Sequence, residues 1–512
     1  MSFFRNRQSR HRLKSAKIDI CRLCYCFSDP QAVFLTTFAA RFLMKKRQMD
    51  NMERTKELGA SDIGSLLWKY AIPSVVTMVI ASIYNLVDRI FLGQCVGALA
   101  IAGLAITMPV MNIMHAFGSL IGVGSASRMS IVLGKKDERW AEKILGNSLL
   151  LTIGLGGTVT LLVYLFMGRI LTLFGASAAT ISYAREYMVI VIPGMWLTTM
   201  SFNLTGLMRA TGYPHKSMLI MAGGALLNIV LDAVFIYVLN WGIAGAAWAT
   251  TLSMATSAVF AFLHFVSPKA FIRFKRHGLR PQGYIFRNIL LIGMSPFLMN
   301  IAASVVVAFL NRQLIRFGGD LAVGAYGIVN TFGTVVVLLM LGVCQGMQPI
   351  AGYNYGAGLN ERLKEVFSKA MRVNVVCGLV GAALALTIPQ ILLRAFTTDV
   401  ELIRIGIPAL RYFMVLMPLV GFTITNSIFF QSIDKPWIAI TTSLSRQVLI
   451  LLPMIYIIPT VFESMGHAGL MGLWASATVS DFLGTVLAAT LLFSQRKVFQ
   501  TALKALPDKG GR

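Results

Sequence analysis

The sequence consists largely of successive apolar blocks, and their length limits the possible folds more than any other feature. Each block holds roughly 20 residues, the length at which a helix crosses the hydrocarbon core of a bilayer. In lipid, every backbone N–H and C=O must be satisfied inside the spanning structure, which leaves helices and closed barrels. The blocks are too long and too uniformly apolar for the alternating strands of a barrel. The sequence therefore predicts an all-α integral membrane protein.

A water-soluble fold is excluded by composition, because 56% of the 512 residues are hydrophobic and only 13% are charged. Soluble domains carry about 25% charged residues. We predict twelve transmembrane helices, at 66–90, 99–127, 144–167, 184–208, 217–239, 243–266, 285–310, 321–349, 366–392, 405–430, 437–460 and 468–494.

The basic residues predict the orientation, since positively charged loops stay on the cytoplasmic side. Three loops are rich in cations: Lys135, Lys136, Arg139 and Lys143 after the second span; Lys269, Arg273, Lys275, Arg276, Arg280 and Arg287 after the sixth; Arg362, Lys364 and Lys369 after the eighth. We therefore place both termini in the cytoplasm and the chain in the inner membrane of a bacterial cell, as a multi-pass protein.

The two halves of the chain are predicted to be repeats. A shift of about 222 residues brings corresponding residues together in constant order: Pro73 and Pro296, Gly124 and Gly346, Gly134 and Gly356, Pro214 and Pro436. Six spans per repeat give both halves the same orientation, as in rocking transporters whose halves enclose a cleft. We expect a basic arm at 1–51, disordered or an over-extended start; an N-lobe at 52–270; a cytoplasmic linker at 271–288; and a C-lobe with a basic tail at 289–512.

Several functional classes lack their signatures. No Walker loop is present, so ATP is not the expected energy source, and no nucleophile motif, zinc pattern or dinucleotide loop indicates an enzyme or a cofactor. The net charge of +25 could suggest nucleic acid. Membrane topology and contact with anionic lipid explain it better, since no nucleic-acid motif is present. We expect a monomer.

Carboxylates inside spans mark the predicted coupling site, because a charge in hydrocarbon is costly unless it is paired, protonated or hydrated. Asp88, Asp232 and Thr250 fall at similar depth, and Asn228 lies one helical turn before Asp232. Carboxylate, amide and hydroxyl oxygens at one level suit Na⁺ or a shared proton. The alternative is structural: Asp88 pairs with a nearby Arg, and Asn228 and Asp232 bond neighbouring helices.

These residues resemble a known family. The segments NLVDRIFLG around Asp88 and GIAGAAWAT ending at Thr250, together with Pro73 and the pair Asn228 and Asp232, are similar to the multidrug and toxic compound extrusion (MATE) family. The resemblance covers about residues 55–495 and is greatest to the bacterial MepA-type and DinF-type branch. It implies a V-shaped pair of six-helix lobes that exports cationic, amphipathic drugs and dyes in exchange for H⁺ or Na⁺.

The resemblance also implies roles for single residues. It places the coupling cation, H⁺ or Na⁺ as a bound metal ion, at Asp88, Asn228, Asp232 and Thr250, with a backbone carbonyl near Ala246 and with Tyr84 in the same wall. Pro73 would let the first helix bend. Some relatives carry acids in spans seven and ten, but 289–310 and 405–430 hold none here. We therefore expect no such cation site in the C-lobe.

Polar residues in other spans are weaker candidates for contact with substrate. Five amides are predicted to line the cleft, although polar residues in spans also hold helices together: Asn203, Asn300, Asn330, Gln345 and Asn426.

The predicted function is a secondary antiporter for small organic cations, with roles in multidrug efflux and antibiotic resistance. Two other classes remain open. A flippase for lipid-linked saccharide precursors would need cations facing the cleft to hold a pyrophosphate. A passive channel would need a selectivity filter.

Overall fold

The computed structural model describes residues 57–95, 98–174, 180–466 and 468–495. These residues contain helices and no strand. The basic arm predicted at 1–51 lies outside them. All of the described residues belong to one compact unit, Glu57–Arg512.

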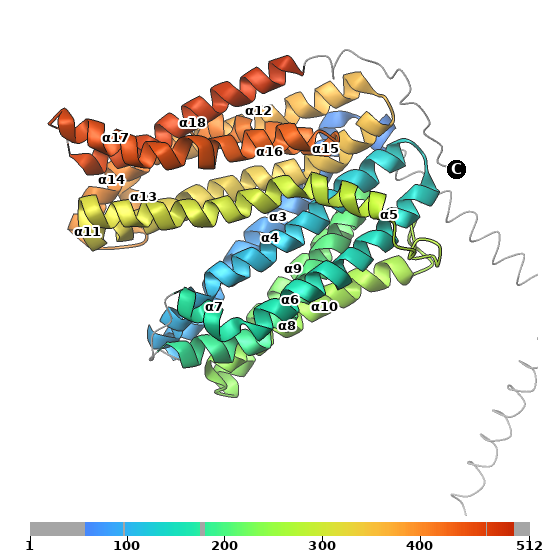
Figure 1. The fold of residues 1–512 in the computed structure, drawn as a ribbon, viewed down its shortest axis with the longest axis horizontal. Coiled ribbons are helices and arrows are strands. Elements are labelled where there is room, and N and C mark those ends of the chain that lie inside the picture. The colour runs from blue at the N-terminus through green and yellow to red at the C-terminus, as the bar shows by residue number, and fades with distance from the viewer. Residues whose placement is uncertain (1–56, 96–97, 175–179, 467, 496–512) are drawn as a thin grey trace, which may run out of the picture. The chain divides into compact units, whose positions relative to one another are not determined.

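The first half of this unit contains the helices α3 to α10 (Figure 1). Their bounds are α3 Ile63–Cys95, α4 Ala98–Gly134, α5 Glu138–Leu151, α6 Gly157–Leu165, α7 Met167–Leu173, α8 Ile181–Ala210, α9 Pro214–Asp232 and α10 Gly242–Val266. Two π-helical turns extend these helices: Thr152–Gly156 joins α5 to α6, and Ala233–Val238 follows α9.

The second half contains the helices α11 to α18. Their bounds are α11 Gly283–Gly356, α12 Asn360–Thr387, α13 Pro389–Arg394, α14 Val400–Met414, α15 Met417–Ser432, α16 Pro436–Leu444, α17 Leu452–Ser464 and α18 Gly469–Ser494. A third π-helical turn, Ser445–Leu451, joins α16 to α17.

The described helices account for all twelve predicted spans. Ten helical segments are long and apolar enough to cross a membrane. One of them, α11, contains two predicted spans, because the backbone leaves helical geometry at Gly319 (φ 64°, ψ −162°), a conformation that glycine accepts without strain. The bent pair α14 and α15, at 45°, supplies the twelfth.

The repeat predicted from the sequence is visible in the packing of α4 against α11. A Cβ atom added at Gly134 would collide with the carbonyl oxygen of Tyr353, and one added at Gly356 would collide with that of Ile131. Ile131 and Tyr353 are separated by the same 222 residues as Gly134 and Gly356. The two contacts are therefore one contact made twice, across an approximate two-fold axis that relates the halves.

Prolines begin repeat-related helices as well. Pro214 is the first residue of α9 and Pro436 the first residue of α16. Proline fits there because its fixed φ suits a helix start and its missing N–H would have no helical partner. The correspondence of Pro214 with Pro436 that the sequence predicted is thus a shared helix start.

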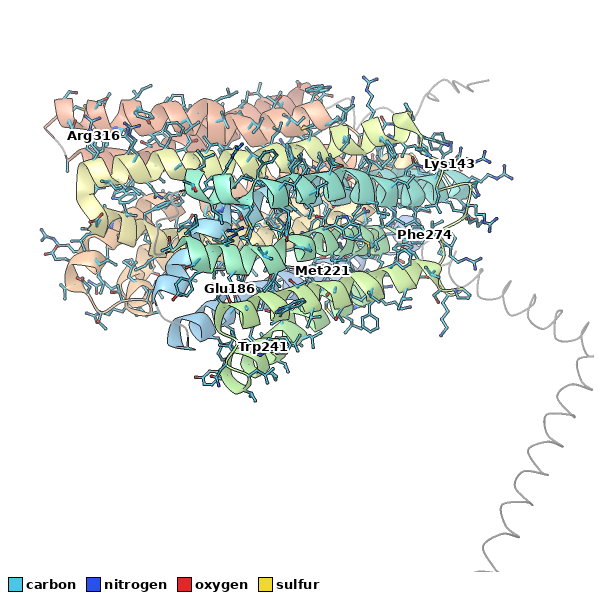
Figure 2. The ribbon with its side chains drawn as sticks, turned by 60° about the horizontal axis from the view of Figure 1, so that its bottom comes forward. Lys143, Glu186, Met221, Trp241, Phe274 and Arg316 are labelled. Carbon is cyan, nitrogen blue, oxygen red and sulfur yellow. The ribbon has the colours of Figure 1, made fainter. Side chains whose placement is uncertain are left out.

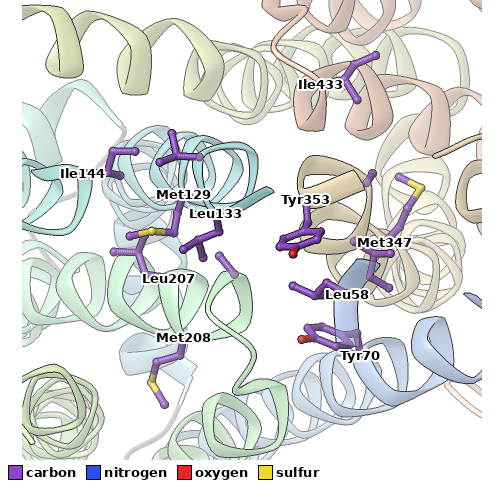
Figure 3. Packing of buried hydrophobic residues seen from close by; sticks show 14 of the residues in the cluster. Leu58, Tyr70, Met129, Leu133, Ile144, Leu207, Met208, Met347, Tyr353 and Ile433 are labelled. Atoms are coloured by element: carbon purple, nitrogen blue, oxygen red, sulfur yellow. The ribbon is translucent and has the colours of Figure 1, made fainter. Parts of the chain in front are cut away.

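One apolar cluster joins the two halves, whereas two further clusters lie within one half each. Figure 3 shows part of the shared cluster, with Met129, Leu133 and Leu207 facing Leu58, Met347 and Tyr353. We call the end of the unit where this cluster, Gly134 and Gly356 lie the closed end. Figure 1 shows α5 at that end, and α7 and α17 toward the opposite end.

Polar contacts also connect the halves near the closed end. Arg128 of α4 pairs with Asp434, in the turn between α15 and α16, at 2.6 Å between Nη1 and Oδ2. Gln348 of α11 donates a hydrogen bond from Nε2 to the Ser127 hydroxyl at 2.6 Å. Apolar packing, close glycine contacts and polar pairs thus hold one end of the two halves together.

Candidate functional site

The predicted coupling residues meet inside the first half, between α9 and α10. Asn228 of α9 donates a hydrogen bond from Nδ2 to the Thr250 hydroxyl of α10, with a donor–acceptor distance of 3.4 Å. Asp232, the last residue of α9, lies one turn beyond Asn228, and its exposed fraction is 0%. The i, i+4 spacing of Asn228 and Asp232 therefore brings an amide and a carboxyl to one buried face.

Three oxygen atoms in this group have no hydrogen-bond partner in the part of the chain that the structure describes. Neither carboxyl oxygen of Asp232 has a hydrogen-bond partner among the described residues, and the same is true of Asn228 Oδ1. A buried polar atom without a partner costs free energy, and a buried charge costs more. Such a group is stabilised by binding a proton or a cation.

Asp88 and Tyr84 reach this group from α3, which packs against α9. The carboxyl groups of Asp88 and Asp232 are close enough to interact electrostatically. Two like charges in a buried site favour sharing a proton or a cation between them. The structure thus brings Asp88 into the neighbourhood of Asn228, Asp232 and Thr250, as the depth comparison predicted.

A further member of the group, Tyr187 of α8, was not predicted from the sequence. This residue is 2% exposed and lies close enough to Thr250, Asp88, Asp232 and Tyr84 to interact with their side chains. Its only sequence signal is a tyrosine inside a span. Which face of α8 meets α10 cannot be read from that signal.

The backbone changes its geometry at the site. A π-helical turn, Ala233–Val238, begins directly after Asp232. Such turns interrupt the regular helical hydrogen bonds and are frequent at functional sites. Ala246, whose carbonyl was predicted to join the site, lies one turn before Thr250 in α10 and is fully buried.

Pro73 lies apart from this group. It is buried inside α3, which runs unbroken from Ile63 to Cys95, and its carbonyl accepts a hydrogen bond from the Thr77 hydroxyl at 2.8 Å. Fifteen residues separate Pro73 from Asp88, roughly 20 Å along a helix. Pro73 can therefore affect the site only through the shape of α3.

Two of the five amides predicted to line the cleft lie inside the helix packing. Asn203 is fully buried; its Oδ1 accepts from the Ser125 hydroxyl at 2.6 Å, and its Nδ2 donates to the Thr152 hydroxyl at 3.1 Å. Asn426 is fully buried, and its Nδ2 donates to the Ala488 carbonyl at 3.0 Å. These contacts are those of residues that hold helices together.

The other three amides are more accessible. Asn330 is exposed, and Gln345 is partly exposed. Asn300 of α11 donates from Nδ2 to the Ser119 hydroxyl of α4 at 3.4 Å, and so connects the two halves. Contact of these residues with substrate remains a prediction.

The second half contains a largely buried ion pair. Arg446 Nη1 lies 2.6 Å from Asp481 Oδ1, and the exposed fractions of the two side chains are 23% and 11%. Arg446 belongs to the π-helical turn between α16 and α17, and Asp481 belongs to α18. Asp481 lies inside the predicted span 468–494, and its partner Arg446 lies inside the predicted span 437–460.

The oxygen atoms of the first half form a hard donor set, which suits Na⁺ better than a transition metal. Within the described ranges, no group of three or more His, Cys, Asp and Glu side chains is placed to hold a metal ion. The residues that fit Na⁺ are Asp88, Asn228, Asp232 and Thr250, because the orphaned oxygens of Asn228 and Asp232 are the kind of ligand that this ion takes.

Comparison with known proteins places the chain among transporters. The family model MatE matches residues 73–234 and 296–457, once in each half. The multidrug export protein MepA of Staphylococcus aureus is 26% identical over 455 residues, which cover 88% of this chain and 97% of that relative.

Solved structures agree with this result. A MOP superfamily transporter from Pyrococcus furiosus matches with a TM-score of 0.80 and 25% identity, over 87% of this chain and 98% of its own. An outward-facing conformation of a multidrug resistance MATE family transporter of the same superfamily matches with a TM-score of 0.80 and 25% identity, over 86% and 97% of the two chains.

Proposed function

This chain belongs to the MatE family of multidrug transporters, and from that premise we propose that it exports cationic, amphipathic organic molecules in exchange for H⁺ or Na⁺. The observation that supports the proposal is the buried group around Asp232. Two carboxyl groups, an amide and a hydroxyl converge there, and both carboxyl oxygens of Asp232 lack a hydrogen-bond partner among the described residues.

In the proposed cycle, the coupling ion binds to this group. An ion from outside neutralises the charge shared by Asp88 and Asp232, which lowers the affinity of the transporter for a bound organic cation. The substrate leaves outward, and the return movement of the two halves carries the ion inward. A ligand shifts such an equilibrium only by its difference in affinity for the two states, and here that difference comes from neutralising the buried carboxyl groups.

We further propose that the closed end faces the cytoplasm. Lys135 and Lys136, and Arg273 and Arg276, lie in loops that connect helices at this end, and Lys364 lies in the first turns of α12. The positive-inside rule then places this end and both termini inside, in a bacterial inner membrane. With the halves joined on the inner side, the molecule would accept ions and release substrate on the outer side.

Substitution of Asp232 tests the proposal. Replacing Asp232 by Asn removes the charge while it preserves the shape, so export of a cationic dye from energised vesicles is expected to fall roughly 10- to 100-fold, the usual effect of losing an interaction with a charged group. Asp320→Asn is the matched control, because Asp320 is exposed and lies away from the site. Undiminished export by correctly inserted Asp232→Asn would overturn the coupling role.

The ion is identified by collapsing the pH and sodium gradients separately in the same vesicles. Loss of dye export with one gradient alone assigns the coupling ion to it. If neither gradient matters and the purified protein instead moves lipid-linked saccharides between leaflets, the flippase alternative replaces antiport. Conductance far above transporter turnover would instead favour a channel.

A further inference from the structure

The segment between α10 and α11, residues 267–282, is fixed to the first half. Asn147 of α5 donates from Nδ2 to the carbonyl oxygens of Gly278 and Arg280, both at 3.1 Å, and its Oδ1 accepts from the Gln282 backbone N–H at 2.8 Å. Phe274 stacks on Phe262 of α10, with ring centroids 5.3 Å apart. We call residues 267–282 the clamped segment.

The acidic residue nearest to this segment is already neutralised. Glu142 of α5 has a side-chain exposure of 8%, and its carboxylate lies 2.6 Å from Lys275 Nζ and 3.1 Å from His277 Nε2. Glu142 is therefore occupied by two groups of the clamped segment. It is thus not the ion-pair partner of the other basic residues near the clamped segment.

An aromatic pair lies where α5 meets the start of α11. The rings of Trp140 and Tyr284 are in edge contact, with centroids 6.3 Å apart and planes at 73°, and Lys143 Nζ lies over the Trp140 ring at 4.8 Å. Tyr284 is 62% exposed. Both aromatic residues occupy the first turn of a membrane span, the level at which Trp and Tyr gather in membrane proteins.

Three basic residues lie near this pair along the chain. Lys143 contacts the Trp140 ring, and Arg287 lies three residues after Tyr284 on the same helix face. The backbone of Arg280 lies close to that of Lys143, because the carbonyl oxygens of both residues accept from the Asn147 amide. None of Lys143, Arg280 and Arg287 forms an ion pair with a carboxylate of the described residues. Figure 2 shows Lys143 and Phe274 at one end of the described helices, with Arg316 toward the other.

We propose that Trp140, Lys143, Arg280, Tyr284 and Arg287 bind the headgroup of an anionic phospholipid from the leaflet at the closed end. Basic pockets between helices at a membrane surface attract phosphate headgroups, and guanidinium groups bind phosphate oxygens through paired hydrogen bonds. The position of the aromatic rings at the membrane boundary favours a lipid over a soluble phosphate. Because Trp140 belongs to the first half and Tyr284 to the second, the bound lipid would contact both.

Native mass spectrometry of the full chain in detergent tests this site. Phosphatidylglycerol and phosphatidylcholine are added separately, and retained adducts are counted. The wild type is expected to retain phosphatidylglycerol preferentially. The triple variant Lys143→Gln, Arg280→Gln and Arg287→Gln is expected to bind it roughly 100-fold more weakly, which corresponds to about 3 kcal/mol for three headgroup cations.

A matched variant distinguishes a specific lipid-binding site from general electrostatic attraction of anionic lipid to this end of the protein. Lys135→Gln, Arg276→Gln and Lys364→Gln remove the same charge from exposed positions at the same end, and this variant should retain phosphatidylglycerol like the wild type. An equal loss in both variants would overturn the proposal. So would competition by inorganic phosphate as effective as that by the lipid, since it would assign the cations to a soluble anion.

Folding is controlled within the same experiment. The single variant Lys143→Arg preserves the charge and should bind as the wild type does, while the melting temperature of each variant without lipid reports its fold. A triple variant that melts like the wild type yet still prefers phosphatidylglycerol would also overturn the site. None of these measurements depends on transport, so failure of this proposal and failure of antiport are distinguishable.

Discussion

Tyr187 and Asp232 show what single residues contribute to the coupling group and how far each could be foreseen. Asn228 and Asp232 were predictable because a spacing of four residues places two side chains on one face of any helix. Tyr187 was not, because its hydroxyl reaches Thr250 only through the way α8 crosses α10. The spacing of residues shows which side chains share one face of a helix, whereas the helix that this face contacts depends on tertiary packing.

Replacing Tyr187 by Phe is expected to weaken coupling without unfolding the protein. The ring stays in place, but the hydroxyl near Thr250 and the two carboxyl groups is lost. The ion concentration for half-maximal dye export should rise about tenfold, as expected when one polar interaction with a charged group is removed. Tyr164→Phe, at an exposed tyrosine of α6, is the control. Unchanged ion dependence in Tyr187→Phe would exclude the hydroxyl from the site.

Among the helices, length and hydropathy were enough to predict the spans. The predicted spans at 217–239 and 243–266 correspond to α9 with its π-helical turn, Pro214–Val238, and to α10, Gly242–Val266. The π-helical turns themselves had no sequence signal, because a single extra residue in a turn is accommodated by packing. The turns after Asp232 and around Arg446 lie in repeat-related spans. The first begins directly after a carboxylate, and the second contains a guanidinium group.

Removing one partner of the ion pair between Arg446 and helix α18 should lower the free energy of unfolding strongly, whereas replacing both partners by apolar residues should change it little. Asp481→Asn leaves a guanidinium poorly compensated in the interior and is expected to destabilise the fold by about 3 kcal/mol or more. The double variant Arg446→Met and Asp481→Leu removes both charges and should be nearly neutral. Thermal unfolding in detergent measures both. Equal destabilisation by the two variants would show that the pair stabilises the helices through more than its charges.

For the whole molecule, the repeat predicted the relation between the halves but not their contacts. The correspondence of Gly134 with Gly356 followed from the sequence. The contacts of Gly134 with Tyr353 and of Gly356 with Ile131 could be seen only in the structure, because they depend on how closely α4 and α11 pack. The lobe boundaries at 52–270, 271–288 and 289–512 remain a prediction.

Gly134→Val is expected to force the halves apart at the closed end, since the added side chain would meet the Tyr353 carbonyl. Overpacking of this kind costs about 1–3 kcal/mol. Spin labels at Lys135 and Lys364, on otherwise cysteine-free protein, should report a longer mean distance than in the unsubstituted protein. Gly157→Val is the control, because a Cβ there has no neighbour within 4 Å. An unchanged distance in Gly134→Val would mean that the helices separate too easily for this contact to matter.

The clamped segment has a mechanical consequence. Because Asn147 and Glu142 bind it to α5, it does not act as a slack tether, and a hinge for the movement of the halves proposed above would lie where Gln282 passes into α11. The helix beyond that point extends for about 50 Å before Gly319, at 1.5 Å per residue. A rotation of about 10° at its base would move the far tip through roughly 9 Å, so α11 would act as a lever pivoted near one membrane face.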